Sequence, residues 1–207
     1  MKKSLGLFTA CGLSLVLGHA ASAATISLGE FNNDGDLEGY TRANIPVFGV
    51  ASGSLNGTVS AGSADPQLFK NFTNNGGAIA PTAGSTFTTL EFRVQETDDL
   101  TGLPLATFDP LGLIFIANGT IYANGTNPGD FTATPSGDGY FTVTADISAL
   151  GSTPISNIRL DPVGGAGVQN NTFSVDYIRV NDTFIPEPAS MALLGLGGLA
   201  MLTRRRK

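Results

Sequence analysis

The stretch Leu113-Ile-Phe-Ile-Ala-Asn-Gly-Thr-Ile-Tyr-Ala-Asn-Gly125 decides the fold class of this 207-residue chain. Residues 113–117 form a continuous apolar run, which indicates a strand that is buried on both faces. Asn118-Gly119 then connects this run to a second candidate strand, residues 120–123, and Asn-Gly between two strands is the strongest short-range hairpin signal. Asn124-Gly125 ends the second strand with the same turn chemistry. The stretch therefore predicts two antiparallel strands joined by a tight turn.

Further strand signals recur on both sides of this hairpin. Residues 86–95 and 140–146 alternate apolar with polar side chains, which is the pattern of a strand with one buried face. The remaining candidate strands are residues 25–31, 54–60, 67–72, 155–160 and 172–180. Residues 98–110 and 162–171 are predicted to be loops, because Gly, Pro and Asp interrupt them. No stretch of the domain has a convincing helical period, so the predicted fold class is all-β, an antiparallel β-sandwich (jelly roll).

The predicted domain, residues 24–185, is acidic, with 16 Asp and Glu residues against 5 Lys and Arg residues. A net charge of −11 repels nucleic acid, so no nucleic-acid partner is expected. Cys11 and His19 are the only cysteine and the only histidine of the chain, and both precede the domain. The domain therefore has no residues for a disulfide, for a metal site with Cys or His ligands, or for a Ser-His or Cys-His nucleophile pair.

Residues 1–23 have the three parts of a secretory signal peptide. Lys2-Lys3 forms the charged start, an apolar segment follows, and Ala21-Ser22-Ala23 is a small-residue cleavage site. Cleavage by signal peptidase would leave a mature chain that begins near Ala24. A lipoprotein signal that ends at Cys11 is the alternative, although the apolar segment before this residue is short.

The last 22 residues show another three-part pattern. Pro186, Glu187 and Pro188 come first, an apolar run at residues 189–203 follows, and Arg204, Arg205, Arg206 and Lys207 end the chain. A helix over the apolar run spans about 22 Å, less than the ~30 Å of a bilayer core, so this predicted transmembrane helix is a marginal anchor. The basic end is expected to stay cytoplasmic, which places the domain outside the inner membrane.

This tail resembles the PEP-CTERM sorting signal of Gram-negative bacterial surface proteins, which is read by an exosortase, a membrane-embedded cysteine protease. The resemblance implies an exported protein that passes through an inner-membrane intermediate. Its destination would be the cell surface, the outer membrane or the extracellular matrix. Exosortase and signal peptidase are then the processing partners, and association with extracellular polysaccharide is expected. A plain C-terminal membrane anchor is the alternative.

Three segments of the domain together resemble the galactose-binding-like jelly roll of many carbohydrate-binding modules. They are residues 30–40 (EFNNDGDLEGY), residues 63–68 (SADPQL), and the pair 158–163 (IRLDPV) and 175–180 (VDYIRV). The first motif of the family usually ends in Gly-Trp, whereas this chain has Gly39-Tyr40. The resemblance implies a β-sandwich, glycan binding, and a structural Ca²⁺ where the first and last strands meet.

The carboxylates expected at such a calcium site are Glu30, Asp34, Asp36 and Asp176, with backbone carbonyl groups near them. Calcium prefers hard oxygen ligands and needs neither His nor Cys. The alternative is a polar turn without a metal, with Asp176 paired to Arg159 or Arg179. No other cofactor is expected.

Tyr40, Tyr122 and Tyr140 are the aromatic residues predicted to stack on sugar rings. Carboxylates at Glu91, Glu96, Asp98 and Asp99 offer the pair that a glycosidase needs, but they are also typical of solvated charge at the end of a strand. The sequence therefore favours an exported, non-catalytic surface or extracellular-matrix protein that associates with exopolysaccharide. A carbohydrate-binding module with a structural calcium is the alternative, and a carboxylate-based glycosidase is a more remote one.

Overall fold

The computed structural model describes residues 23–59, 66–98, 101–110, 113–127, 129–163 and 172–184. These residues form strands and one short 3-10 helix (Ser148–Leu150). The strands are β1 (Ala23–Gly29), β2 (Thr41–Ala43), β3 (Val47–Ala51), β4 (Ser54–Thr58), β5 (Gln67–Asn71), β6 (Ser85–Asp98), β7 (Leu103–Pro104), β8 (Ile114–Ala117), β9 (Thr120–Asn124), β10 (Phe131–Pro135), β11 (Tyr140–Asp146), β12 (Asn157–Asp161) and β13 (Thr172–Phe184). In this described part of the chain, no helix is both long and apolar enough to span a membrane. The predicted signal helix and the predicted C-terminal transmembrane helix lie outside the described residues.

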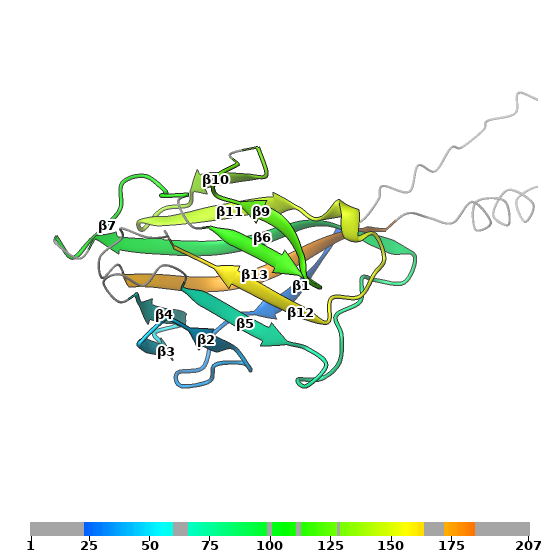
Figure 1. Cartoon of the computed structure of the whole chain (residues 1–207), viewed down its shortest axis with the longest axis horizontal. Helices are drawn as coiled ribbons and strands as arrows, with labels where there is room; N and C mark the ends of the chain where they lie inside the picture. The colour runs from blue at the N-terminus through cyan, green and yellow to red at the C-terminus, as the bar shows by residue number, and fades with distance from the viewer. Residues whose placement is uncertain are drawn as a thin grey trace, which may run out of the picture.

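The strands form two antiparallel sheets that stack as the layers of a β-sandwich (Figure 1). The first sheet has the order β10-β11-β6-β13-β4-β3, and the second has the order β2-β5-β12-β8-β9. β4 and β1 share one edge of β13: β4 pairs with the first half of this strand, and β1 pairs with the second half. The predicted antiparallel β-sandwich is confirmed, and its first and last strands lie side by side.

One hydrophobic core fills the space between the two sheets, because alternate side chains of each strand point inward. β6 contributes Phe87, Leu90, Phe92 and Val94 from the first sheet, all fully buried. The second sheet contributes Leu68, Phe115 and Leu160 among others, and these residues belong to the same cluster. On β6 the side chains between these buried residues are polar and only partly buried, as the alternating sequence pattern predicts.

Two bulges change which side chains of the central strands face outward. Opposite Asn181, β6 carries the extra residue Thr88, so the alternation of buried residues slips between Phe87 and Leu90. In β13 the extra residue is Asp176, so that both Asp176 and Tyr177 leave the core while their neighbours stay in it. Bulges of this kind redirect side chains locally. The second bulge therefore adds a carboxylate to the outer face of the first sheet.

The hairpin predicted from Asn118-Gly119 is confirmed as β8–β9. Both turn residues have positive φ, 50° for Asn118 and 82° for Gly119, as a two-residue turn of this type requires. The expectation that residues 113–117 are buried on both faces is wrong. Leu113, Phe115 and Ala117 are fully buried, whereas Ile114 and Ile116 are only half-buried on the other face, because β8 belongs to a sheet with one covered side.

Candidate functional site

The carboxylates predicted to bind calcium form separate contacts with arginines and with backbone N–H groups. Glu30 follows β1 and accepts two hydrogen bonds from the Arg179 guanidinium on β13, at 3.0 and 2.8 Å. These bonds hold the pKa of Glu30 below its ordinary value of 4.5. Asp176 accepts a hydrogen bond from Arg93 Nη1 at 2.7 Å, and not from Arg159 or Arg179 as the sequence suggested. Both carboxylates are therefore neutralised by the protein itself.

The other two carboxylates belong to a hydrogen-bonded turn. Asp34 Oδ1 accepts from the backbone N–H of Ser52 at 2.8 Å, and Asp36 Oδ1 accepts from the backbone N–H of Glu38 at 2.8 Å. Among the described residues, no group of three or more His, Cys, Asp or Glu side chains is placed to hold a metal ion. The four predicted ligands therefore do not fit one calcium site in this structure, and calcium binding stays a prediction.

Tyr40 lies in the core, so the prediction that it stacks on a sugar is wrong. The side chain is 2% exposed, packs edge-on against Phe31 at 5.4 Å, and donates a hydrogen bond to the carbonyl of Leu28 at 3.3 Å. A Cβ at Gly29 would lie 3.0 Å from the Tyr40 ring, so the glycine makes room for it. Burial raises the pKa of Tyr40 well above 10.0. The ring has no face that a ligand in solvent can reach.

Tyr140 and Tyr177 lie on the outer face of the first sheet, each beneath an arginine. The Arg93 guanidinium lies 4.0 Å from the Tyr140 ring centroid, and the Arg179 guanidinium lies 3.8 Å from the Tyr177 ring centroid. The Tyr177 hydroxyl donates to Glu91 at 2.8 Å. Cation–π stacking of this kind covers a ring face. The predicted sugar-stacking residue Tyr140 is therefore partly covered by its own protein.

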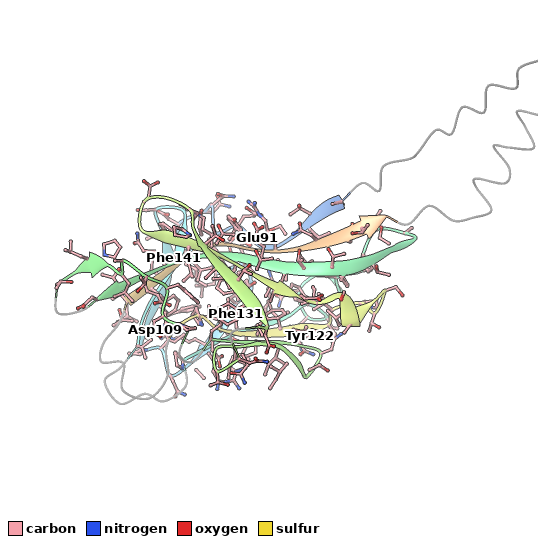
Figure 2. The ribbon with its side chains drawn as sticks, turned by 90° about the horizontal axis from the view of Figure 1, so that it is seen from above. Glu91, Asp109, Tyr122, Phe131 and Phe141 are labelled. Atoms are coloured by element: carbon pink, nitrogen blue, oxygen red, sulfur yellow. The ribbon has the colours of Figure 1, made fainter. Side chains whose placement is uncertain are left out.

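A hollow of about 440 Å³ opens at the β10 edge of the sandwich. Figure 2 looks down on this edge and labels Phe131 and Phe141 there, with Tyr122 on the neighbouring strand β9. The hollow is lined by Phe108, Phe131, Phe141, Pro110 and Pro135, with Ala106, Thr107 and Ala133 between them. Phe108 lies 6.1 Å from Phe131 and 5.9 Å from Phe141, centroid to centroid. Three aromatic rings therefore line one open, mostly apolar depression.

The pairing of β10 with β11 and the loop after β7 build this hollow. Phe131 and Pro135 on β10 are opposite Ala145 and Phe141 on β11, so these side chains share the inner face of the sheet. The loop brings Phe108 over them. Tyr122 is half-buried and packs against the edge of the core, and β9 contacts β11 across the gap between the sheets. Of the predicted tyrosines, Tyr122 lies on β9 near this edge and Tyr140 precedes the lining residue Phe141 on β11, but neither lines the hollow.

A buried acid lies under the same loop. Glu96 on β6 is 1% exposed, and its Oε2 accepts from the backbone N–H of Asp109 at 3.3 Å. The Glu96 carbonyl accepts from the N–H of Leu105 at 2.8 Å. Oε1 has no hydrogen-bond partner among the described residues. Burial raises the pKa of Glu96 to about 8, so the side chain is protonated at neutral pH.

Glu91 and Glu96, two of the carboxylates proposed for a glycosidase, do not face each other in this structure. Glu91 faces outward and accepts from Tyr177, whereas Glu96 is buried on the inner face of the same strand. Asp98 accepts from the backbone N–H of Thr101 in the turn after β6, and Asp99 lies outside the described residues. Catalytic carboxylates must flank one glycosidic bond at about 5–10 Å. Glu91 and Glu96 project from opposite faces of the sheet and do not meet this requirement.

Comparison with known proteins gives a match to a sorting-motif model and a weak likeness to a solved structure. The model of the PEP-CTERM protein-sorting motif matches residues 184–207. No curated protein matches the chain. Among solved structures, the N-terminal cellulose-binding domain of β-1,4-glucanase C from Cellulomonas fimi is similar, with 19% sequence identity and a TM-score of 0.36. The alignment covers 78% of this chain and 99% of that domain, and a likeness this low says nothing about what this chain binds.

The matched residues contain every part of the tail pattern, from Pro186-Glu187-Pro188 to the terminal arginines. The chain therefore carries a PEP-CTERM sorting motif at residues 184–207 and is an exported, membrane-sorted surface protein.

Proposed function

We propose that this protein is a non-catalytic component of the cell surface or extracellular matrix that binds neutral polysaccharide at the β10-edge hollow. The sorting motif at residues 184–207 is the observation that carries the surface assignment. In this proposal an exosortase removes the tail, and the β-sandwich then meets exported polysaccharide. The alternatives to binding at the hollow would be binding at the outer face of the first sheet, or no binding at all.

The chemistry of the hollow supports a ligand with an apolar face. Phe108 and Phe131 are half-buried and line the depression, so part of each ring is exposed to it. Sugar rings present C–H groups on their faces, and aromatic side chains bury such surface favourably. Thr107 supplies a hydroxyl group in the lining. The hollow thus offers stacking surface with a polar group beside it, whereas Tyr40 is buried and Tyr140 lies beneath Arg93.

The charge of the domain favours a neutral polysaccharide over an anionic one. With 16 acidic and 5 basic residues, the domain repels uronic-acid, sulfated or phosphorylated polymers over distances of a Debye length. Three of the five basic residues are held in ion pairs, namely Arg93, Arg159 and Arg179. Little positive charge therefore remains to attract an anionic chain.

The experiment is a pull-down of the processed, exported protein with the neutral and anionic polysaccharide fractions of its own host. Phe108→Ala and Phe131→Ala test the hollow, and Phe48→Ala is the matched control. Phe48 is a half-buried ring on β3, at the opposite edge of the same sheet, where it stacks with Arg42. We expect retention by the neutral fraction to fall at least tenfold in the two hollow variants and to stay unchanged in the control. Equal retention of all three variants, or no retention of the wild type, would overturn binding at the hollow.

A further inference from the structure

We infer that cleavage between Ala23 and Ala24 is a maturation step that completes the fold, because it creates an α-ammonium group that pairs with Asp182. The inference combines the predicted signal-peptidase site with the contacts of one buried carboxylate. It does not depend on what the hollow binds.

Asp182 is a fully buried carboxylate on β13 that lacks a positively charged side-chain partner among the described residues. Its exposed fraction is 0%. Oδ1 accepts from the backbone nitrogen of Ala24 at 3.2 Å, and Oδ2 accepts from the backbone nitrogen of Thr82 at 2.6 Å. The ion pairs of the described residues involve other acids. Burying a carboxylate is costly unless hydrogen bonds or an opposite charge compensate it, and an ammonium group at the Ala24 nitrogen would add an opposite charge to the hydrogen bond already present there.

Signal-peptide cleavage supplies such a cation at the nitrogen that Asp182 already contacts. Hydrolysis adds water across the Ala23–Ala24 amide. Ala23 leaves with the leader as a carboxylate, and the Ala24 nitrogen becomes an amine that takes up a proton. An α-amino group has an ordinary pKa of about 7.7–8.0, so it is largely charged at neutral pH. The neutral N–H that donates to Asp182 in the precursor is thereby replaced by an ammonium group, which makes a stronger, charge-assisted bond.

The strand register makes this pairing specific for one cleavage position. Ala24 lies opposite Asp182, Ala23 lies opposite Thr183, and Thr25 lies opposite Asn181. A terminus one residue longer would place the ammonium group opposite Thr183, and a terminus one residue shorter would remove the contacting nitrogen. Because Ala23 and Ala24 are both within β1 in the folded domain, the protease must act before this strand docks on β13. The ion pair therefore forms only in chains whose leader has been removed.

The test is a double-mutant cycle on protein that the cell has exported and processed. One change inserts a threonine between Ala23 and Ala24, which moves the new terminus by one residue. The other is Asp182→Asn, and Asp146→Asn is the matched control because Asp146 is an exposed aspartate that caps a turn in the same sheet. Intact mass establishes each terminus. We expect the insertion to lower Tm by several degrees in the wild-type and Asp146→Asn backgrounds, and to have little effect in the Asp182→Asn background.

A native terminus at a residue other than Ala24 would overturn the inference. An insertion effect of equal size in all three backgrounds would overturn it as well. If Asp182→Asn does not fold, titration of the Ala24 α-amine in the wild type decides. Reductive ¹³C-methylation keeps the charge of this amine and gives an NMR signal. A pKa above the ordinary range of about 7.7–8.0 supports the ion pair, and a value within that range contradicts it.

Discussion

Arg179 binds Glu30 with two parallel hydrogen bonds, from Nε to Oε1 at 3.0 Å and from Nη2 to Oε2 at 2.8 Å. Glu30 follows the first strand and Arg179 lies on the last strand, so the pair joins the two ends of the domain. The same guanidinium stacks on Tyr177, whose hydroxyl donates to Glu91. Where the family resemblance places a calcium ion, this chain has a guanidinium group that takes up the Glu30 carboxylate.

Replacing Glu30 by glutamine should lower the free energy of unfolding by about 1 kcal/mol at neutral pH, because both partners are about one-third exposed. The Arg179 bonds lower the pKa of Glu30 below 4.5. Its contribution is therefore present above pH 4.5 and is lost as pH falls through the lowered folded-state pKa. Urea unfolding between pH 3 and 7 measures this, with the exposed Asp138→Asn as control. An acid profile of Glu30→Gln that matches the wild type would contradict the assignment.

Calcium should not change the thermal stability of this domain. Glu30 and Asp176 each already have an arginine partner, and binding a cation would require both ion pairs to break. We expect the same Tm in EDTA and in millimolar Ca²⁺, measured by calorimetry. A ligand at 100 times its Kd would add about 2.7 kcal/mol, which is easily detected. A rise of several degrees with Ca²⁺ would show that the predicted site forms after rearrangement of the turn.

The free energy of unfolding should fall as pH rises from about 4.5 to 8, because the folded domain keeps Glu96 protonated. The folded state keeps this carboxyl protonated up to a pKa of about 8, whereas the unfolded chain releases the proton near 4.5. The stabilisation is thus complete below pH 4.5 and is lost as pH rises through the folded-state pKa. The difference corresponds to roughly 5 kcal/mol at most. Asp109 is the charged neighbour that adds to the effect of burial.

Glu96→Gln separates this effect from other titrations, because the amide keeps the shape and stays neutral at every pH. We expect the variant to match the wild type at pH 5 and to exceed it by several kcal/mol at pH 9, measured by urea unfolding. Glu91→Gln is the control on the outer face of the same strand. If wild type and Glu96→Gln lose stability in parallel above pH 6, the buried acid is not the cause.

Asn118 should contribute more to the free energy of unfolding than a typical turn residue does. Its side chain donates to the carbonyl of Pro154 at 2.9 Å and accepts from the backbone N–H and the hydroxyl of Ser156, at 2.8 and 2.9 Å. These bonds join the β8–β9 turn to the segment before β12. Asn118→Ala loses them and also places alanine at a φ of 50°. We expect a loss of about 2–3 kcal/mol in urea unfolding, and Asn118→Gly, which relieves only the backbone, should recover a part of it.

Gly125→Ala should disturb the hollow from the side of the loop. A Cβ at this position would lie 1.6 Å from the carbonyl oxygen of Pro110, so the backbone segments have to move apart. Pro110 lines the hollow, and we expect both a loss of about 2 kcal/mol or more in stability and weaker polysaccharide retention. Gly49→Ala is the control, since its added Cβ meets nothing within 4 Å. If a folded Gly125→Ala protein is retained by polysaccharide as well as the wild type, the loop does not contribute to binding.

The strands with strong alternation or a clear turn signal could be predicted from the sequence, whereas β3 and β10, at the two edges of the first sheet, could not. β6 and β11 alternate clearly, and the break in the alternation of β6 between Phe87 and Leu90 corresponds to a bulge. β3 and β10 were not predicted, because Gly49 interrupts the first and Pro135 ends the second. Both lie at the edge of a sheet, where glycine and proline are tolerated. Local sequence therefore indicates the centre of the first sheet better than its edges, whereas the edge strand β9 of the second sheet is predicted by its Asn-Gly turn.

The candidate site could not be predicted, because its residues meet only through tertiary structure. Phe108 lies in a segment interrupted by prolines, Phe131 on an unpredicted strand and Phe141 on a predicted one. Only the β10–β11 pairing and the loop above it bring them together. The prediction that Tyr40 stacks on a sugar was wrong because tertiary structure buries this side chain. The polar sequence neighbours of Tyr40 suggest that its side chain is exposed. Gly29, which has no side chain, leaves room for the Tyr40 ring in the core.

The position of β13 determines when the domain can finish folding. This strand pairs with β6 on one side and with β4 and β1 on the other, yet it is the last strand in the chain and ends at Phe184. A chain that leaves the cytoplasm from its amino end must keep β1 and one edge of β4 unpaired until nearly the whole domain has crossed. Contacts between such distant residues also form slowly. The topology therefore makes the first sheet complete only when the residues next to the sorting motif are available for pairing.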